Sequence, residues 1–342
     1  MSVKKAISSS DVARLAGVSR SAVSRTFTPG AYVSDETRAK VMAAAEALSY
    51  RPNAIARSLS TSQSGLIGIV TSSLDNPFYA RLLSTLATLL QAQGYGILLV
   101  VADDANFDTL IESLLAYQVN GAILTTAPLR STSAFELQRY GKPVVLVDRY
   151  LNQEMISSVS GDNHAGSAAV ADLLVRGGHQ RVAFLGGDEG TSSSRDRRHG
   201  FTDRLARHGI VLYAEESGFY SYELGMVAAR KLLALSPKPD AIFCANDAMA
   251  VAAVEVARAE FGLRIPEDIA IVGYDNAGPV GWPTYQLTTV DQNLEEMAQA
   301  AIDLLVRKLE SGDVSTEHLS VAPTLVERST TREQPAAAGK AA

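Results

Sequence analysis

The pattern of hydrophobic and polar positions changes character at about residue 65. Beyond that point, apolar runs of four to six residues alternate with longer stretches that carry a single apolar stripe. Runs of this length, rich in Leu and β-branched residues, are typical of strands that are covered on both faces of a parallel sheet. We therefore predict strands at residues 66–70, 96–101, 121–124, 143–147, 182–185, 241–244 and 269–272.

The stretches between these runs have the spacing of amphipathic helices. The first, over residues 78–92, repeats Leu82, Leu86 and Leu90 on one face, and Gly94 follows as a helix stop. Strand–helix alternation over about 200 residues predicts an α/β fold of doubly wound parallel sheets. This region is large for one open sheet, so we expect two similar lobes that divide near Asp162.

The first 52 residues follow a different pattern, that of short helices separated by turns. Residues 11–16 and 20–27 form a predicted helix pair, in which Gly17 supplies the positive φ of the turn and Ser19 caps the second helix. A third helix begins at Ser34 and is expected to brace the pair through Val41, Ala44, Ala45 and Leu48. We predict a small inward core of Val12, Leu15, Val18 and Val23. The outer face of the second helix then carries Arg20, Ser21, Ala22, Ser24 and Arg25.

Charge is distributed unevenly along the chain. The 342 residues carry a net charge of −6, yet residues 1–64 hold nine basic and four acidic residues, a net +5, which leaves −11 for the remainder. A basic head on an acidic body favours a polyanionic partner for the head alone. An exposed helix with Arg and small polar side chains can enter the major groove, where Arg pairs bidentately with guanine. The alternative is a three-helix module that only packs against other parts or binds protein.

The head resembles the LacI/GalR family of bacterial transcription regulators. The resemblance rests on the segment DVARLAGVS at 11–19, VSR at 23–25, VSDETR at 33–38, LSYRPN at 48–53 and ARSL at 56–59, and it continues through the body. It implies base reading by Arg20, Ser21 and Arg25, with Ala22 beside them. It also implies phosphate contacts from Ser19, Ser24, Ser34, Thr37 and Asn53. Thr28-Pro29 and Ser9 depart from the family pattern, which puts one phosphate contact and the start of the first helix in doubt.

The same resemblance implies a hinge helix near residues 53–60 that folds on operator DNA. Leu59 would then be a minor-groove wedge with Ala56 close by, and an apolar wedge of this kind bends the duplex. An ordinary apolar linker residue is the alternative for Leu59. The expected domains are a helix-turn-helix unit at 8–52, a hinge at 53–65, a two-lobed core at 66–330 with crossovers near 162, 291 and 322, and a disordered tail at 331–342.

The body resembles the family's effector core, which is related to periplasmic sugar-binding proteins. Its ligand would lie between the lobes at the carboxyl ends of the strands. Aromatic faces with Asp, Asn and Arg suit a polyhydroxylated ligand. The candidate effector residues are Phe78, Tyr79, Asp148, Arg149, Asp162, Ser194, Arg197, Tyr220, Asn246 and Asp275. For each of them, a loop cap or a salt bridge between lobes is the alternative role.

Two further features bear on the ligand. Arg149, Arg195 and Arg197 hint at an anionic effector such as a sugar acid, although neutral sugars also use Arg. Trp282 lies near the expected lobe junction, where it could stack on a sugar or simply pack.

Other functional classes find little support. The chain has no HExxH, P-loop, GxGxxG or GxSxG motif, and the single Cys244 excludes a disulfide framework, so we expect no metal, no cofactor and no enzyme activity. No apolar run reaches the length of a membrane span and no secretory signal is visible, so we expect a cytoplasmic protein. The tail lacks heptads, which favours a homodimer. The favoured function is an effector-controlled repressor; a sugar-binding protein without gene control and an α/β enzyme with a DNA-binding head are the alternatives.

Overall fold

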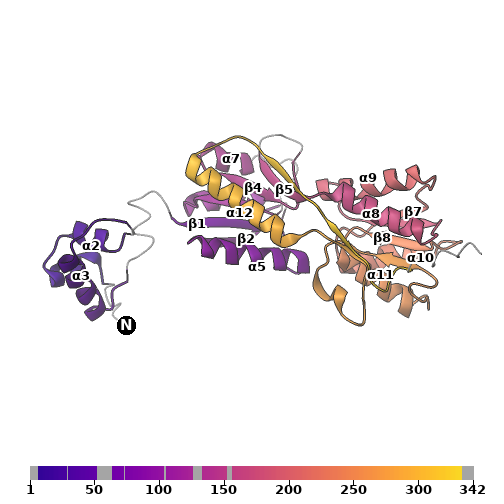
Figure 1. The fold of residues 1–342 in the computed structure, drawn as a ribbon, viewed down its shortest axis with the longest axis horizontal. Coiled ribbons are helices and arrows are strands. Elements are labelled where there is room, and N and C mark those ends of the chain that lie inside the picture. Colours follow the sequence, from indigo (N-terminus) through magenta and orange to yellow (C-terminus); the bar gives the residue numbers. More distant parts are fainter. Residues whose placement is uncertain are drawn as a thin grey trace, which may run out of the picture. The chain divides into compact units, whose positions relative to one another are not determined.

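The chain forms two compact units, Met1–Ser64 and Gly65–Ala342, in the computed structural model. The structure describes residues 7–28, 30–51, 64–72, 74–103, 105–125, 133–151 and 156–332 (Figure 1). The proposed hinge residues Asn53, Ala56 and Leu59, together with Pro29 and the tail from residue 333, lie outside the described residues.

The described residues of the N-terminal unit form three helices: α1 (Ser9–Ala16), α2 (Arg20–Thr26) and α3 (Asp35–Ala47). The backbone and hydroxyl of Ser8 both donate to the Asp11 carboxylate, at 3.0 and 2.7 Å, so α1 begins at Ser9 with a polar cap. Gly17 has φ +65°, and Ser19 accepts from the Ala22 N–H, as the sequence predicts. The turn and both helix starts are therefore fixed by local chemistry.

The core of this unit is small. Val12, Val23 and Val41 are fully or almost fully buried, and Ala13, Ala44 and Ala45 pack with them. The prediction that Leu15 joins this core is wrong, because its side chain is 55% exposed. At 100° per residue, Leu15 lies about 110° from the centre of the inward arc that Val12, Ala13 and Ala16 define on α1. Val18 packs against the core at its edge, as predicted.

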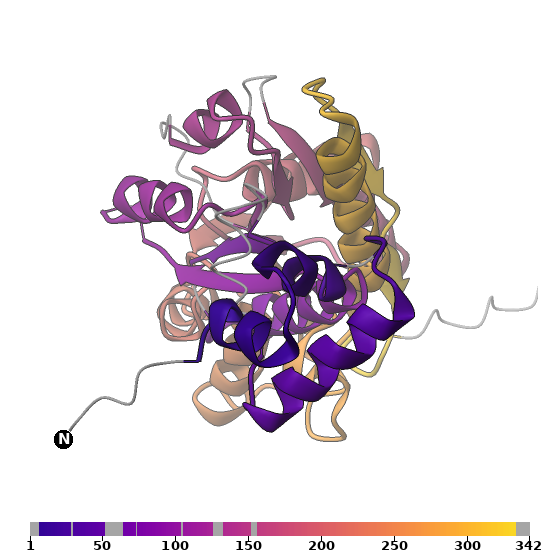
Figure 2. The ribbon, with the colours of Figure 1, turned by 90° about the vertical axis from the view of Figure 1, so that its left-hand side faces the viewer.

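The N-terminal lobe of the second unit is built on a six-stranded sheet, here the N-lobe sheet. All pairings are parallel, in the order β11-β5-β4-β3-β1-β2. The strands are β1 (Leu66–Thr71), β2 (Gly96–Val101), β3 (Gly121–Leu124), β4 (Val144–Val147), β5 (Ser157–Gly161) and β11 (His318–Val321). Figure 2 shows the gold helix α12 (Leu294–Ser311) on one side of this sheet and α6 (Phe107–Ala116) and α7 (Ser133–Arg139) on the other. Helix α5 (Pro77–Ala92) packs beside α12.

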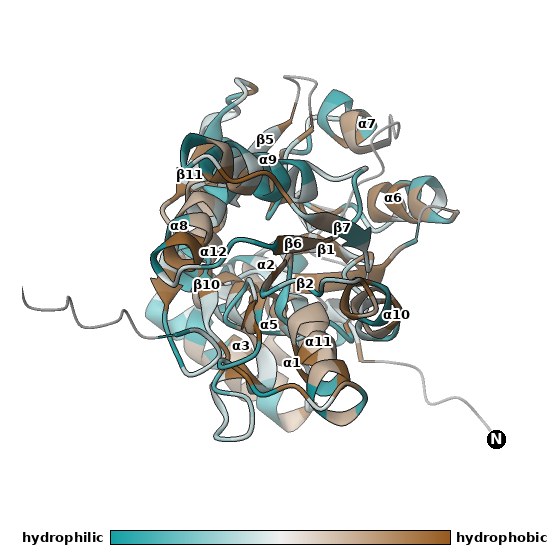
Figure 3. Ribbon diagram, turned by 90° about the vertical axis from the view of Figure 1, so that its right-hand side faces the viewer, coloured by the Kyte–Doolittle hydropathy of each residue, from teal (hydrophilic) through white to brown (hydrophobic). Residues whose placement is uncertain are grey.

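The C-terminal lobe contains a second parallel sheet, the C-lobe sheet, in the order β7-β6-β8-β9. Its strands are β6 (Val182–Gly186), β7 (Ala214–Ser217), β8 (Ala241–Cys244) and β9 (Ala270–Val272). Two helix pairs accompany this sheet, α8 (Asn163–Arg176) with α9 (Ser192–Arg207), and α10 (Tyr222–Leu233) with α11 (Asp247–Ala259). Figure 3 shows β6 in hydrophobic colours and α9 in hydrophilic ones, as a buried strand and an outer helix require.

The chain passes between the lobes at three places. These are the junction of β5 with α8, the junction of β10 (Thr289–Asp291) with α12, and the junction of β11 with β12 (Thr324–Val326). Strands β10 and β12 pair antiparallel beside one another.

All seven predicted strands are present, and the α/β fold class with its helical head and two-lobed core is confirmed. The sequence reading missed β5, β7, β10, β11 and β12. These strands are short and carry polar residues, as in the segment SSVSG of β5 and AEES of β7, so they lack the apolar run that marked the others.

Candidate functional site

The outer face of α2 presents the predicted DNA-reading side chains. Arg20, Ser21, Ser24 and Arg25 are exposed, and Ala22 is half-buried. The hydroxyls of Ser19 and Ser21 lie 2.9 Å apart at the start of the helix. The exposed side chain of Arg20 has no hydrogen bond or ion pair within the described residues, so its guanidinium is available to a ligand.

The start of α3 holds two further candidates. Ser34 accepts from the Thr37 N–H at 3.3 Å and donates to its hydroxyl at 2.9 Å. Arg38 donates to the carbonyl oxygen of Thr26 at 3.1 Å and so ties α3 to the end of α2. The two helix starts are therefore held on a fixed three-helix frame.

A small cavity of about 20 Å³ lies between the two lobes of the second unit. Side chains from both lobes line it: Asn76, Phe78, Tyr79 and Asp148 from the N-lobe, and Ser193, Arg197, Tyr220 and Asp275 from the C-lobe. Most of these residues follow the carboxyl ends of strands, where open α/β sheets bind ligands. The cavity thus gathers six of the ten predicted effector residues.

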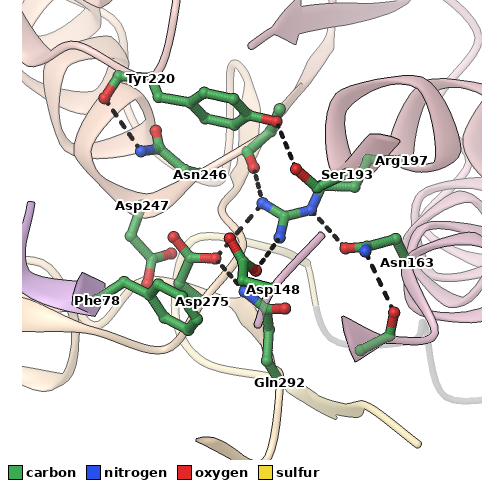
Figure 4. Close-up of polar contacts among 12 residues, drawn as sticks. Phe78, Asp148, Asn163, Ser193, Arg197, Tyr220, Asn246, Asp247, Asp275 and Gln292 are labelled. Atoms are coloured by element: carbon green, nitrogen blue, oxygen red, sulfur yellow. Dashed lines mark hydrogen bonds and ion pairs between the residues drawn. The ribbon is translucent and has the colours of Figure 1, made fainter. Parts of the chain in front are cut away.

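Arg197 is the centre of this cleft (Figure 4). Its Nε donates to Asn163 Oδ1 at 2.8 Å, and its Nη1 donates to the Ala245 carbonyl at 2.6 Å and to Asp275 Oδ1 at 3.4 Å. Its Nη2 lies 3.8 Å from Asp148 Oδ1, so one cation bridges carboxylates from both lobes. The guanidinium also lies over the Tyr274 ring, 3.9 Å from the centroid. Arg197 is therefore held by hydrogen bonds through Nε and Nη1 and by an ion pair through Nη2.

A second chain of contacts begins at Tyr79. Its hydroxyl donates to Asp148 Oδ2 at 3.0 Å and accepts from Arg149 Nη2 at 2.9 Å. Burial raises the pKa of Asp148, against the opposing effect of Arg197 and Arg149. Asp148 Oδ1 is buried and has no hydrogen-bond partner among the described residues. An acceptor of this kind favours a ligand that donates a hydrogen bond.

Backbone strain is concentrated around the cleft. Asp148, Tyr220, Asp275 and Asn276 have φ values of 72°, 62°, 116° and 50°. Residues other than Gly rarely adopt positive φ, and such strain is commonly stored at ligand sites. These strained positions point to a built binding site.

Asp247 and Gln292 support the cleft from behind, and the sequence reading missed both. Asp247 accepts from the Ala277 N–H at 2.8 Å and from the Thr289 hydroxyl at 2.6 Å, which holds the loop that carries Asp275. Gln292 donates to Asp275 Oδ1 at 2.8 Å. Burial raises the pKa of Asp247 to about 7 and that of Asp275 well above its usual range. Asp247 follows the predicted strand at 241–244, which was the available signal, whereas Gln292 follows β10, which the sequence did not predict.

The remaining predicted effector residues lie around the cavity rather than on it. Asn246 caps α11 through Met249 and donates to the Tyr220 carbonyl at 3.2 Å. Asp162 caps α8 and lines a neighbouring pocket with Tyr150 and His318. Arg149 reaches the cleft through Tyr79.

Ser194 and Trp282 also lie off the cleft. Ser194 lines a separate cavity of the C-lobe. Trp282 is 64% exposed beside the short helix η1 (Gly278–Gly281). Gly278 lies so close to α5 that a Cβ there would sit 3.1 Å from Pro77 Cγ, so the segment before Trp282 abuts the N-lobe.

The described residues contain no group of three or more His, Cys, Asp or Glu side chains that could hold a metal ion. Within the same residues, no helix is long and apolar enough to cross a membrane.

Cys244 is buried, and burial raises the pKa of its thiol, which disfavours the nucleophilic thiolate.

Known proteins share both units. Residues 10–53 match the model of bacterial regulatory proteins of the lacI family, and residues 171–331 match a periplasmic binding protein-like domain. The ribose operon repressor of Escherichia coli (strain K12) is 32% identical over 323 residues, which cover 93% of this chain and 98% of that protein. The sucrose operon repressor of Pediococcus pentosaceus is 33% identical over 310 residues, covering 90% and 94%.

The whole fold also has a solved counterpart. The crystal structure of the lac repressor dimer bound to operator and an anti-inducer superposes with a TM-score of 0.85 at 32% identity, covering 96% of this chain and 99% of that one. The relatives match the head, the lobes and the full length together. This chain therefore belongs to the LacI family of bacterial regulatory proteins.

Proposed function

We propose that this chain is a sequence-specific DNA-binding transcriptional repressor whose operator affinity is set by a small sugar bound between its lobes. The observation that carries the proposal is the Arg197 cluster, which joins carboxylates of both lobes around a cavity in a chain that also bears an exposed, Arg-bearing α2. A ligand there contacts both lobes at once. Its binding energy can therefore shift the lobe arrangement, and by linkage the affinity for DNA.

The cleft chemistry favours a neutral sugar over a sugar acid. Nε and Nη1 of Arg197 donate hydrogen bonds to Asn163, Ala245 and Asp275, so these two nitrogens are taken by the protein itself. Asp148 Oδ1 is a buried acceptor without a hydrogen-bond partner among the described residues, and a sugar hydroxyl can satisfy it; Arg149 Nε is a buried donor that also has none.

We further propose a cytoplasmic homodimer that performs no catalysis. Two pairs of exposed apolar side chains support a self-interface, Leu99 and Val101 on the edge strand β2 and Leu224 and Val227 on α10. Two copies would bring two α2 helices to the half-sites of a near-palindromic operator. The relatives named above are repressors, which favours regulation over chemistry.

A mobility-shift titration tests the DNA proposal. The probe is DNA from upstream of the protein's own gene, and the competitor is a scrambled duplex of equal length. We expect Arg20→Ala to weaken binding to the upstream DNA by about 1–3 kcal/mol while random DNA is bound almost as before. Arg14→Ala, exposed on α1 of the same unit, is the control and should leave the ratio of the two affinities unchanged. Equal affinity of the unaltered protein for both duplexes would contradict sequence-specific recognition.

Calorimetry tests the ligand class. Neutral monosaccharides are titrated in parallel with their uronic acids, for example galactose with galacturonate. We expect binding of a neutral sugar that Asp148→Asn weakens at least tenfold, because the variant loses the carboxylate acceptor. Tight binding of the uronic acid alone would reverse the choice of ligand class.

A further inference from the structure

Tyr150 connects the two lobes at a point outside the interlobe cavity. It follows β4 of the N-lobe, directly after Asp148 and Arg149. Its backbone N–H donates to the Ser192 hydroxyl at 2.9 Å, and its own hydroxyl donates to Asp196 Oδ1 at 3.1 Å. Both acceptors lie on α9 of the C-lobe. One residue therefore makes two hydrogen bonds across the lobe boundary.

Helix α9 separates these bonds from the cavity. Ser193 and Arg197 line the cavity (Figure 4), whereas Ser192 and Asp196 hold Tyr150. The members of each pair are one turn apart, so each pair forms a row along the helix, and the two rows are rotated by about 100°. Tyr150 and Asp196 line a neighbouring pocket instead. The Tyr150 bonds therefore act on the lobes from outside the lining of the cavity.

The Tyr150 hydroxyl is a hydrogen-bond donor at neutral pH. Burial and Asp196 raise its pKa, against the opposing effect of Arg195, so it keeps its proton. Ser192 is only 1% exposed, so water competes little for the bond to the Tyr150 backbone. A hydrogen bond of this kind favours the arrangement that makes it by roughly fivefold. The two bonds together therefore bias the lobes toward the arrangement seen here, the closed arrangement.

The closed arrangement leaves little room between the lobes. The cavity measures about 20 Å³, and a cavity needs about 10–15 Å³ to hold one water molecule. A monosaccharide is several times larger than a water molecule. The walls of the cavity are held by the hydrogen bonds of Tyr79 and Arg197. A sugar therefore needs the lobes to move apart, which stretches the bonds between Tyr150 and α9.

We propose that Tyr150 is a positioning residue that holds the lobes in the closed arrangement and lowers the affinity for the effector without touching it. The inference rests on the proposed function, in which a sugar binds between the lobes. Binding of the sugar has to release the Tyr150 bonds, and the free energy of that release weakens the observed affinity. By linkage, the same bonds also affect the affinity for DNA.

Pulsed dipolar spectroscopy of two spin labels measures the lobe separation in the full chain without any ligand. The labels are attached at Glu112→Cys on α6 and Arg207→Cys on α9, both exposed, while the native cysteine is buried. Labelled chain is mixed with an excess of unlabelled chain, so that only distances within one chain are recorded. We expect a second distance population in Tyr150→Phe/Ser192→Ala that is at least roughly fivefold larger than in the unaltered chain. Tyr140→Phe, at an exposed tyrosine of the same lobe, is the matched control.

Asp196 provides a rescue experiment. Asp196→Ala removes the acceptor and should also produce the second population. Asp196→Asn keeps an oxygen acceptor and should restore the distribution of the unaltered chain. Identical distributions in the unaltered chain and in Tyr150→Phe/Ser192→Ala would overturn the proposal. So would a second population of equal size in Asp196→Asn and Asp196→Ala, because the charge of Asp196 and not its bond to Tyr150 would then hold the lobes.

Calorimetry with ribose and with galactose tests the effect on affinity. We expect a sugar that binds the unaltered chain to bind Tyr150→Phe roughly fivefold more tightly, because one bond no longer has to be released. Weaker binding by the variant would show that the Tyr150 bonds favour the effector, contrary to the proposal. If neither sugar binds either chain, the cleft proposal loses support, and the distance measurement still decides the role of Tyr150.

Discussion

At the scale of single residues, the cleft is held together by buried charges that compensate one another. Arg197 is 2% exposed and Asp148 and Asp275 are 4% and 5% exposed, so each carboxylate depends on the guanidinium for compensation. Removing one partner of a buried ion pair leaves an uncompensated charge in a medium of low polarity. Ligand binding and folding therefore rest on the same arginine.

Arg197→Ala should lower the free energy of unfolding by about 3–5 kcal/mol, because both carboxylates lose their counter-charge. Urea denaturation at neutral pH measures the change. Arg207→Ala, an exposed position on the same helix, should stay within about 0.5 kcal/mol of the unaltered protein. If Arg197→Ala lowers the free energy of unfolding by less than about 1 kcal/mol, water already compensates the carboxylates of Asp148 and Asp275.

Asp247 gives stability a definite dependence on pH. Burial raises its pKa from 3.8 to about 7, so between these values the folded chain holds a proton that the unfolded chain has released. The free energy of unfolding contributed by this group therefore falls as the pH rises from about 4 to about 7, and then levels off. Asp247→Asn should flatten that decline in urea denaturation curves measured across this range. An unchanged slope in the variant would assign the decline to another group.

The sequence located most of the cleft residues because they follow predicted strands, and parallel strands bring their carboxyl ends to one edge of the sheet. It placed Phe78, Asp148 and Asp275 correctly on a shared cavity but chose Ser194 where the cavity contains Ser193. One residue along a helix is a rotation of about 100°, which separates the two sides of α9. Gln292 escaped notice because its role depends on a chain crossing, which no local pattern encodes.

At the scale of elements, the stability of a short helix depends on its N-terminal cap. Helix α2 spans Arg20–Thr26, and a helix this short has little stability of its own. Its first turn depends on Ser19, which accepts from the Ala22 N–H at 3.2 Å. The order of the outer face of α2, which is the predicted DNA-reading face, therefore depends on this cap.

Ser19→Ala should destabilise α2 by about 1 kcal/mol, because the Ala22 N–H loses its acceptor. Amide hydrogen exchange of the full chain should then show roughly fivefold faster exchange in α2, with α3 unaffected. Ser24→Ala, at an exposed position in the middle of the same helix, is the matched control. Equal protection of α2 in both variants would show that packing on Val12 and Val41 holds the helix without its cap.

The buried strands were the elements that the sequence predicted best. Strands such as β1 and β8 are apolar on both faces, and each was predicted within a residue of its observed bounds. The edge strands β7 and β11 are partly exposed and polar, so their pairing is decided by distant neighbours rather than by their own pattern. Leu15 has a different cause: it lies about 110° from the inward arc of α1, so its side chain reaches the surface.

At the scale of the whole molecule, self-association determines how the operator is read. Leu224 and Val227 are each 47% exposed and lie one turn apart on α10, which leaves an apolar stripe open to a second copy. A dimer doubles the number of recognition helices that can engage one operator.

Val227→Asp should convert the dimer to a monomer and weaken operator binding by roughly tenfold or more, because a charge is buried in the apolar contact and the second half-site is lost. Sedimentation velocity and the mobility-shift titration measure the two effects. Val211→Asp, at a position that is 84% exposed, should change neither. A Val227→Asp protein that remains dimeric would move the interface to another surface, such as β2.

The position of Trp282 gives the protein a built-in optical reporter. It is the single tryptophan of the sequence. It follows the segment in which Gly278 lies close to Pro77 of the N-lobe. All indole fluorescence therefore comes from one point next to the seam that effector binding would open or close. Lobe movement can be followed by emission wavelength and quenching in the unmodified chain, without a label and without DNA.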